Sequence, residues 1–196
     1  MTFEAATEIT ILAPDHPRLL AAIAGACAAC EANIVDAQIF TTSDGFALDT
    51  IFVSRELPLN EDEQRRAERI GKQIETILAG KARVEDLIQA RARRQGRIRA
   101  FSVEPDVLVN NTWSNRYTVI EISGLDRPGL LYELTAVLAK LNLNIASAHV
   151  ATVGERAVDV FYVTDLTGQK ITNANRQGAI RRHLMQVFKP TRENAA

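Results

Sequence analysis

The chain has 196 residues, which is long enough for one large domain or two small ones. Its formal net charge is −1 and its isoelectric point is about 6.3, so it lacks the basic field that draws proteins to nucleic acids or anionic membranes. It contains no apolar run near the ~18 residues of a membrane span, and its start, MTFEAATEIT, lacks the basic and apolar regions of a secretory signal. Two cysteines are too few for a secreted disulfide scaffold, so the composition predicts a soluble cytoplasmic protein with no nucleic-acid or membrane partner.

An internal duplication organises the sequence. Residues 9–41 align with residues 120–152 at a constant offset of 111 positions. The positions with the same residue in both segments include Asp15, Pro17, Leu19, Leu20, Asn33, Ile34, Ala37 and Thr41. After one deleted position the match resumes, with Asp49 aligned to Asp159 and Val53 to Val163. Because self-similarity at a fixed offset indicates a repeated structural unit, the sequence predicts a tandem pair of similar domains.

The first copy follows the order strand, helix, strand, strand, helix. Ile9 and Ile11 alternate as in a strand, and the Asp-x-Pro turn after them places Pro17 in the first turn of a helix, where its missing N–H costs nothing. The apolar stripe of that helix consists of Leu20, Ile23, Cys27 and Cys30. The stripe makes the two cysteines core residues rather than a redox pair. A second strand and a third, over residues 46–53, follow. The residues expected to share one face of the second strand are Val35, Ala37 and Ile39.

The second helix of the first copy is expected to begin near Asn60. Asn60 and Glu63 resemble a capping box at its start. The apolar stripe behind them consists of Ile70, Ile74, Ile77 and Leu78. Gly80 is expected to end that helix, and a shorter helix follows from Val84. Alternation predicts a fourth strand through Phe101, Val103, Val107 and Val109. Pro105 marks it as an edge strand, and it can complete either sheet.

The second copy repeats this order and ends after its second helix, near Phe188. The expected fold class is α+β, with two tandem ferredoxin-like βαββαβ domains whose antiparallel sheets carry helices on one face. The expected boundaries are residues 1–98 for the first domain, 99–115 for a linker or strand, and 116–196 for the second domain.

The turn GLDRPGLL, residues 124–131, is the main candidate site. The start of a helix has N–H groups without intrahelical partners and a partial positive charge, which suit a carboxylate. Gly129 removes the side chain that would block it, and Asp126 supplies a carboxylate for an ammonium group. Asn144, at the start of the next strand, can both donate and accept. These groups suit a free amino acid, and the same residues also suit an ordinary helix cap and turn.

The stretch GLDRPGLLYELTAVLAKLNLNIASAHVAT resembles the ACT domain, a family of modules that bind mostly amino acids and regulate attached enzymes. In that family the loop before the first helix and the start of the second strand contact the ligand, often across two ACT domains that lie side by side. The ligand-binding residues that the resemblance implies in the second copy are Asp126, Arg127, Gly129, Leu130, Asn144 and Ile145. Those in the first copy are Asp15, Arg18, Asn33 and Ile34. Arg18 stands where the motif has glycine, so it either fills that site or clamps a carboxylate, and we favour the second copy.

A longer match covers most of the chain. The segments EPDVLVNNTWSNRYTVIEISGLDRPGLLYEL and RAVDVFYVTDLTGQKI resemble the C-terminal tandem ACT region of the bacterial bifunctional PII uridylyltransferase/uridylyl-removing enzymes. The resemblance implies a module of nitrogen metabolism that senses L-glutamine and is attached to upstream catalytic domains, which use a divalent metal such as Mg²⁺. The sequence has neither a Gly-Ser followed by Asp-x-Asp nor a His-Asp dipeptide with companion histidines. We therefore expect no catalysis, metal or cofactor in this chain.

Two other functions stay open. One is an ACT-like interaction or oligomerisation module without a ligand, because the sheet edges favour pairing of ACT domains within one chain or in a homodimer. The other is an RNA-binding βαββαβ domain, which would stack bases on aromatic residues of its central strands. The first strand of each copy carries no aromatic residue at its centre, and the net charge is slightly acidic. An independent enzyme is not indicated, because Asp49 and Asp159 are isolated carboxylates on strands.

Overall fold

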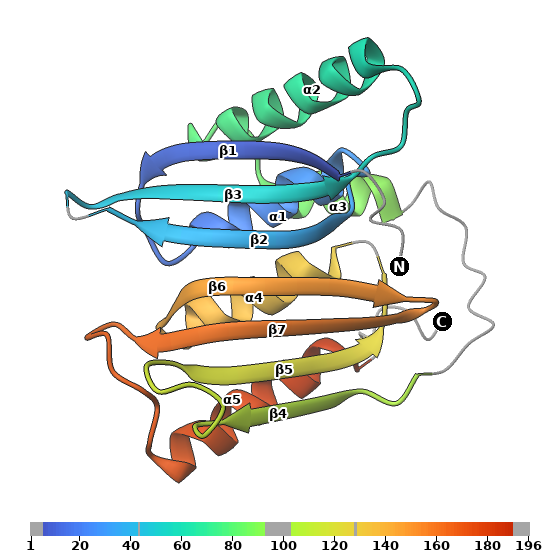
Figure 1. Ribbon diagram of the computed structural model, residues 1–196. Coiled ribbons are helices and arrows are strands. Elements are labelled where there is room, and N and C mark those ends of the chain that lie inside the picture. Colours follow the sequence, from blue (N-terminus) through green and yellow to red (C-terminus); the bar gives the residue numbers. More distant parts are fainter. Residues whose placement is uncertain (1–5, 43, 93–102, 128, 190–196) are drawn as a thin grey trace.

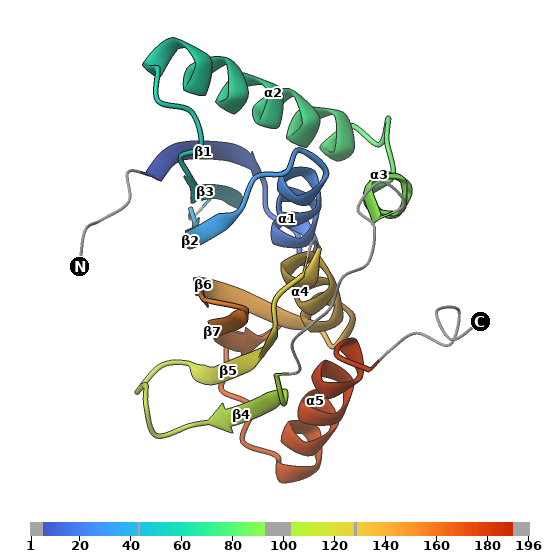
Figure 2. The ribbon, with the colours of Figure 1, turned by 90° about the vertical axis from the view of Figure 1, so that its right-hand side faces the viewer.

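Both copies contribute strands to one antiparallel sheet of seven strands, in a computed structural model that describes residues 6–42, 44–92, 103–127 and 129–189 (Figure 1). The first half contains β1 (Ala6–Pro14), α1 (Leu19–Ala29), β2 (Ile34–Thr41), β3 (Phe46–Ser54), α2 (Asn60–Leu78) and α3 (Val84–Ala92). The second half contains β4 (Asp106–Asn110), β5 (Thr118–Leu125), α4 (Leu130–Lys140), β6 (Leu143–Val153), β7 (Arg156–Asp165) and α5 (Ala174–Val187). The predicted α+β class is confirmed, with α1, α4 and α5 on one face of the sheet (Figure 2). Within the described ranges, no helix has the length and apolar character needed to cross a membrane.

Strands β2 and β6 join the two copies side by side within one chain. The strand order is β1-β3-β2-β6-β7-β5-β4, so β2 and β6 are neighbours. Ala37 lies opposite Ala148, which is its own repeat equivalent. Across the same junction, Asp36 Oδ1 lies 3.0 Å from His149 Nδ1. The junction therefore has an internal two-fold axis, as an interface between two identical subunits would have.

Strand β4 extends the sheet of the second copy. It pairs with β5, and Val107 lies opposite Ile122. As the last strand of the sheet, β4 occupies the edge position that Pro105 indicates. The first copy thus contributes three strands and the second contributes four. Of the residues in the predicted fourth strand, Phe101 lies outside the described part of the chain.

A β-bulge near the start of β2, and another near the start of β6, change the predicted faces. The pairing register skips Val35 in β2 and the equivalent Ala146 in β6. The prediction that Val35 shares a face with Ala37 is wrong, because the extra residue of a bulge interrupts the alternation. Val35 is 36% exposed, whereas Ile34 is 5% exposed. The bulge therefore turns the residue after Asn33 into the core.

Helices α1 and α4 begin later than the proline of each motif predicts. The first helical residues are Leu19 in α1 and Leu130 in α4. A turn precedes each helix, and in the second copy the N–H of Leu130 donates to the carbonyl oxygen of Arg127 at 3.0 Å. Pro17 thus belongs to this turn rather than to the helix, and its equivalent, Pro128, lies outside the described residues. In the first copy, the Asp-x-Pro motif is therefore part of the loop that precedes α1.

Glu63 does not form the predicted capping box. No side chain caps the start of α2. Instead, the Glu63 carboxylate accepts hydrogen bonds from the N–H of Leu57 at 3.1 Å and from the hydroxyl of Thr7 at 2.7 Å. It also pairs with Arg66 at 2.8 Å, and both of these side chains are 6% exposed. Because buried charges need such additional hydrogen bonds, Glu63 fastens β1, the β3–α2 connection and α2 at one point.

Cys27 packs in the core, as its place in the apolar stripe predicts. Its side chain is fully buried. Burial, with a smaller effect of Cys30, raises the pKa of the Cys27 thiol to about 12. Because the thiolate is the reactive form, a thiol in this environment behaves as a small apolar group.

Helix α3 lies beside α1 of the first copy (Figure 2) and also contacts the second copy. A Cβ atom at Gly25 of α1 would lie 2.1 Å from Cγ1 of Val84, so α3 approaches α1 at a point where only glycine fits. On the other copy, the hydroxyl of Tyr132 in α4 donates to Glu85 of α3 at 2.8 Å. The helix therefore connects the first copy to the start of α4.

Replacement of Gly25 by alanine should lower the free energy of unfolding by about 1–3 kcal/mol, because the added methyl group pushes α3 away from α1. Gly71→Ala is the matched control, since Gly71 lies within α2 and a Cβ there meets nothing within 4 Å. That change should raise stability by about 0.5–1 kcal/mol through helix propensity. Urea denaturation measures both effects. Stabilisation by both substitutions would show that α3 does not pack on Gly25 in solution.

Candidate ligand-binding site

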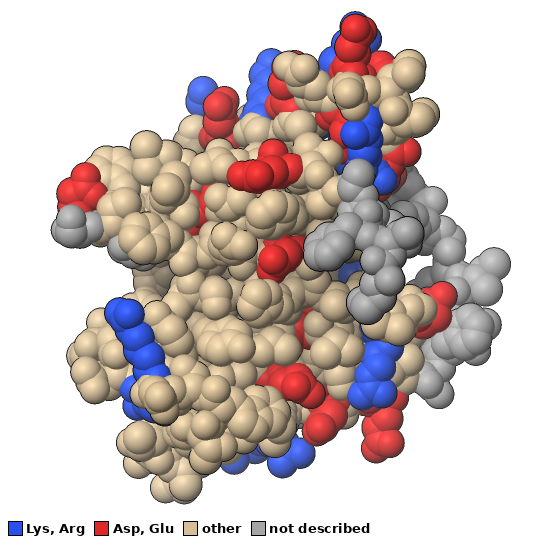
Figure 3. Space-filling view, viewed as in Figure 1, with Lys and Arg blue, Asp and Glu red and all other residues tan. Residues whose placement is uncertain are grey.

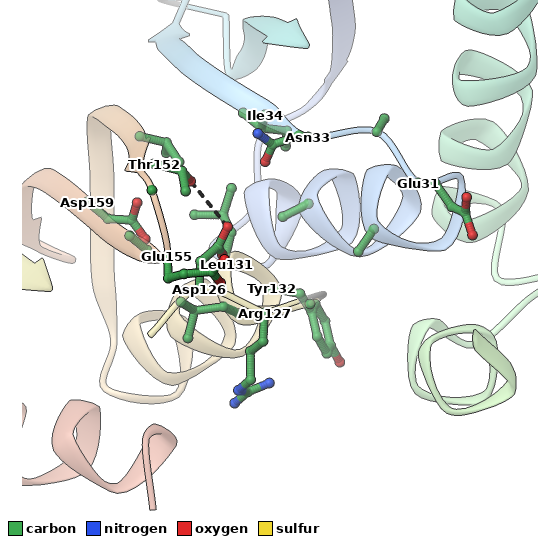
Figure 4. Close-up of a pocket in the computed structure, with 18 residues that line it drawn as sticks. Glu31, Asn33, Ile34, Asp126, Arg127, Leu131, Tyr132, Thr152, Glu155 and Asp159 are labelled. Carbon is green, nitrogen blue, oxygen red and sulfur yellow. Dashed lines mark hydrogen bonds between the residues drawn. The ribbon is translucent and has the colours of Figure 1, made fainter. Parts of the chain in front are cut away.

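A pocket of about 320 Å³ lies at the junction of the two copies (Figure 4). The first copy contributes residues from the end of α1 to the start of β2, namely Ala24, Ala28, Glu31, Ala32, Asn33 and Ile34. The second copy contributes the loop before α4, the first turn of α4 and the β6–β7 hairpin, including Asp126, Arg127, Gly129, Tyr132, Thr152 and Asp159. This volume is at the lower end of the ~300–1,000 Å³ range of small-molecule pockets, so the pocket suits a ligand of amino-acid size.

The junction determines which predicted residues meet. Antiparallel pairing of β2 with β6 places the start of β2 beside the end of β6. The predicted residues in the pocket are Asn33 and Ile34 of the first copy and Asp126, Arg127, Gly129 and Leu130 of the second. The predicted residues that do not line it are Asn144, Ile145, Asp15 and Arg18. Asp126 thus shares the pocket with Asn33 rather than with Asn144 of its own copy, because the two-fold junction brings the start of β2 to the end of β6.

The Asp126 carboxylate faces the pocket from the loop before α4. Its Oδ2 accepts a hydrogen bond from the hydroxyl of Thr152 at 3.2 Å (Figure 4), and its backbone N–H donates to the carbonyl oxygen of Glu155 at 2.9 Å. The N-cap residue of α4 is Gly129, and no side chain caps this helix. Asp126 therefore does not act as the helix cap that its sequence position also suits.

Gly129 and Arg18 make the two helix starts different. Gly129 has φ of 81°, in the left-handed region, which favours glycine. A Cβ atom there would lie 3.3 Å from Cγ2 of Ile88 in α3. At the equivalent position of the first copy, Arg18 has φ of −102°. The start of α4 therefore has a residue without a side chain beside the pocket, whereas the start of α1 has an arginine.

Arg127 lines the pocket, but its guanidinium group is bound within the protein. Two of its nitrogen atoms lie 2.5 Å from the two carboxylate oxygens of Glu133. One of them also donates to the carbonyl oxygen of Val187 at 3.1 Å. Bidentate pairing of this kind fixes the orientation of the guanidinium plane, so Arg127 connects α4 to the end of α5 and its charge is already balanced.

Tyr132 connects the pocket to α3, and sequence reasoning missed it. Its hydroxyl donates to Glu85 at 2.8 Å. Burial, followed by the hydrogen bond and charge of Glu85, raises the pKa of Tyr132 to about 12. The phenol thus stays protonated and keeps its hydrogen bond. The sequence offers no local signal for this contact, because 47 positions separate the two residues.

Asp159 is a buried carboxylate in the wall of the pocket. It lies on β7, is 2% exposed, and its Oδ1 has no hydrogen-bond partner among the described residues. Burial, followed by the charge of Asp126, raises the pKa of Asp159 to about 7. Unsatisfied buried carboxylates are rare in native proteins, so this residue, which the sequence shows only as an isolated carboxylate, is a functional candidate.

Asp49, the repeat equivalent on β3, has the same environment without the pocket. It is 1% exposed, and both carboxylate oxygens lack a hydrogen-bond partner in the part of the chain that the structure describes. Burial, followed by the charge of Asp15, raises its pKa to about 7, and the backbone N–H of Phe40 offsets part of this rise without reaching hydrogen-bonding geometry. The sequence signal that could have identified Asp159 is an aspartate at the same strand position in both copies.

The charges around the pocket favour a cationic group on the ligand. The carboxylates that line it are Glu31, Asp126, Glu155 and Asp159. The cationic side chain in the same lining is Arg127, which Glu133 neutralises. Opposite charge nearby stabilises the ionised form of both partners, so the lining of this pocket is electrostatically suited to a cationic group.

The face of the sheet opposite helices α1, α4 and α5 offers little support for RNA binding. Acidic residues and few basic ones lie over its centre (Figure 3). The phosphate backbone requires basic residues along the binding surface. This face therefore lacks the electrostatic character that the RNA-binding alternative needs.

Comparisons with known proteins agree with the duplication. Residues 7–75 match the family model described as ACT domain, and residues 114–191 match the model described as ACR family N-terminal ACT domain. A bifunctional uridylyltransferase/uridylyl-removing enzyme from Rhodopseudomonas palustris is 64% identical over 186 residues, which cover 94% of this chain and 20% of that enzyme. The enzyme of the same name from Nitrobacter hamburgensis is 64% identical over 182 residues, which cover 93% of this chain and 20% of that enzyme. The chain thus spans about one fifth of the length of these relatives.

Solved structures align only loosely with the whole chain. The regulatory subunit of aspartate kinase from Thermus thermophilus, in its ligand-free form, is 13% identical and aligns over 94% of this chain and 99% of that chain. Its TM-score is 0.27.

The variants Asp49→Asn and Asp159→Asn should each raise the free energy of unfolding at pH 8 by on the order of 1–3 kcal/mol, and by less at pH 5. The folded-state pKa of about 7 lies above the ordinary value of 3.8. The folded chain therefore holds protons that the unfolded chain loses, so stability falls as the pH rises from about 4 to about 7. Asparagine carries no charge at either pH. Urea denaturation at both pH values measures the change.

The exposed variant Asp62→Asn in α2 is the control, and its effect should stay within about 0.5 kcal/mol. Equal effects of a buried substitution at pH 5 and pH 8 would contradict a raised pKa at that position.

Proposed function

The chain belongs to the ACT-domain family, with two of its domains in tandem, and we propose that it is the glutamine-sensing regulatory module of a bacterial PII uridylyltransferase/uridylyl-removing enzyme. The observation that carries the proposal is the acidic pocket built by both copies at the start of α4. The two relatives that are 64% identical support the choice of parent enzyme. In this proposal, uridylyl transfer and removal on the PII signal protein belong to upstream catalytic domains with a divalent metal such as Mg²⁺. This chain supplies regulation of cytoplasmic nitrogen metabolism and no catalysis.

The pocket provides a complementary group for each end of a free amino acid. The N–H of Leu130 already donates to Arg127. The groups of the first turn of α4 that suit the ligand carboxylate are therefore the backbone N–H groups of Leu131 and Tyr132. Asp126 offers a carboxylate to the ammonium group, and charge-assisted hydrogen bonds of this kind are among the stronger ones in proteins. Asn33 stands at the opposite wall with a side-chain amide, which can donate to and accept from the carboxamide of glutamine.

The affinity that regulation requires is modest. A metabolite at millimolar concentration needs a binding free energy of only about −4 kcal/mol. A coupling of about 1–3 kcal/mol between this pocket and the catalytic domains would change the activity of those domains about 5–150-fold. The same factor must appear in the affinity for the ligand, because the coupling of two binding equilibria is reciprocal.

We expect the chain to bind L-glutamine with a millimolar or tighter Kd, and Asp126→Ala to weaken binding by about 1–3 kcal/mol, because it removes one charged hydrogen bond. Isothermal titration calorimetry measures both values. Asp15→Ala is the matched control, since Asp15 has the same motif position in the first copy and does not line the pocket. It should change the affinity by less than about two-fold.

Two results would contradict this proposal. One is a folded chain that gives no heat with millimolar glutamine. The other is an equal loss of affinity in Asp15→Ala and Asp126→Ala, which would move the site away from the pocket at the start of α4.

A further inference from the structure

We propose that Asp159 is a specificity-determining residue that binds the ammonium group of the amino-acid ligand together with Asp126, an inference that rests on the proposed function. The two carboxylates reach the same pocket from different elements, Asp126 from the loop before α4 and Asp159 from β7 (Figure 4). Asp126 accepts a hydrogen bond from Thr152, whereas Oδ1 of Asp159 has no partner among the residues described. Asp159, the more deeply buried of the two carboxylates, therefore has an oxygen atom that can accept a further hydrogen bond.

Within the described ranges of the chain, Asp159 Oδ1 has no hydrogen-bond partner. In the sheet, Asp159 lies opposite Ile122 of β5 and Val150 of β6, and both of these residues are buried. Its neighbours on the same face of β7 are the buried residues Ala157 and Phe161. A carboxylate among apolar side chains loses its hydration without compensation. The pocket is therefore the place from which a partner can reach it.

The neighbouring charges favour a cation as that partner. The titratable groups that share the pocket are Glu31 after α1, Asp126 and Arg127 before α4, Tyr132 in α4, and Glu155 in the β6–β7 turn. Arg127 pairs with Glu133, and Tyr132 donates to Glu85. Among the residues that the structure describes, the cationic side chain that lines the pocket is therefore already paired with an acidic group of the protein. An ammonium group can donate three hydrogen bonds, enough to bridge Asp126 and Asp159.

The inference has a consequence for pH. Asp159 has a pKa of about 7, so the free chain holds a proton on it at pH 6. A cationic group binds the ionised carboxylate, because opposite charge favours that form. Binding at pH 6 therefore releases this proton, and the affinity rises as the pH increases through about 7.

The test compares L-glutamine with 4-carbamoylbutanoate, which is glutamine without its amino group. Wild type should bind glutamine about 10–100-fold more tightly than the analogue, as expected for a charged hydrogen bond. Asp159→Asn should lose about 10-fold or more in affinity for glutamine and less than about three-fold for the analogue. Asp49→Asn is the matched control, because it changes an equally buried carboxylate that does not line the pocket. It should leave both affinities unchanged.

The proton count is a second, independent measurement. Calorimetry of wild type at pH 6 in buffers of different ionisation enthalpy should show release of nearly one proton per glutamine bound, and Asp159→Asn should abolish it. If wild type binds glutamine but Asp159→Asn keeps the affinity, the discrimination and the proton release, the inference is overturned and the proposed function stands. If wild type binds neither compound, both are overturned.

Discussion

The pairing of β2 with β6 is the interaction on which the rest of the structure depends. It places Ala37 opposite its own equivalent, Ala148, so that two similar units share one sheet instead of folding as separate domains. The two-fold relation brings α1 beside α4 on the same face (Figure 1) and places the start of β2 beside the loop before α4. The pocket then has one wall from each copy. In a single copy, the helix start and the carboxylate have no strand start across from them to close the pocket. The other copy supplies that strand start, which gives a physical reason for the duplication.

The second constraint is the cost of the buried carboxylates. Asp49 and Asp159 occupy equivalent positions on the inner faces of β3 and β7, and each has another aspartate nearby, Asp15 and Asp126 respectively. Apolar residues at these positions would stabilise the sheet, because a buried charge without a partner is among the least favourable features of a core. Residues that reduce stability in this way often belong to functional sites. The asymmetry between copies then becomes informative, because the pocket lies at Asp159 and not at Asp49.

Local patterns in the sequence predicted the elements, and long-range contacts decided the site. Alternation at Ile9 and Ile11 and the spacing of the helical stripe depend on neighbouring residues, so the order of strands and helices followed from the repeat. The bulge at Val35 is a single extra residue, which a two-residue period cannot reveal. Glu63 bonds to Thr7, 56 positions away, so its spacing from Asn60 suggested a cap that does not form. Asn33 meets Asp126 only through the β2–β6 junction. The motif thus supplied the chemistry of the site, whereas the pairing of the two copies supplied its geometry.

Helix α3 provides a physical route between the pocket and the rest of the chain. Tyr132 lines the pocket and bonds to Glu85 of α3, and Ile88 of the same helix lies close to Gly129. A ligand against the first turn of α4 therefore touches residues that position α3. Contact alone does not produce regulation, because a ligand shifts an equilibrium only by the difference in its affinity for the two states. In this fold, Asn33 and Asp126 line the pocket from different copies, and α3 contacts both copies, at Gly25 of the first and Tyr132 of the second. A ligand in contact with both Asn33 and Asp126 would therefore bind this arrangement of the copies in preference to one that separates them.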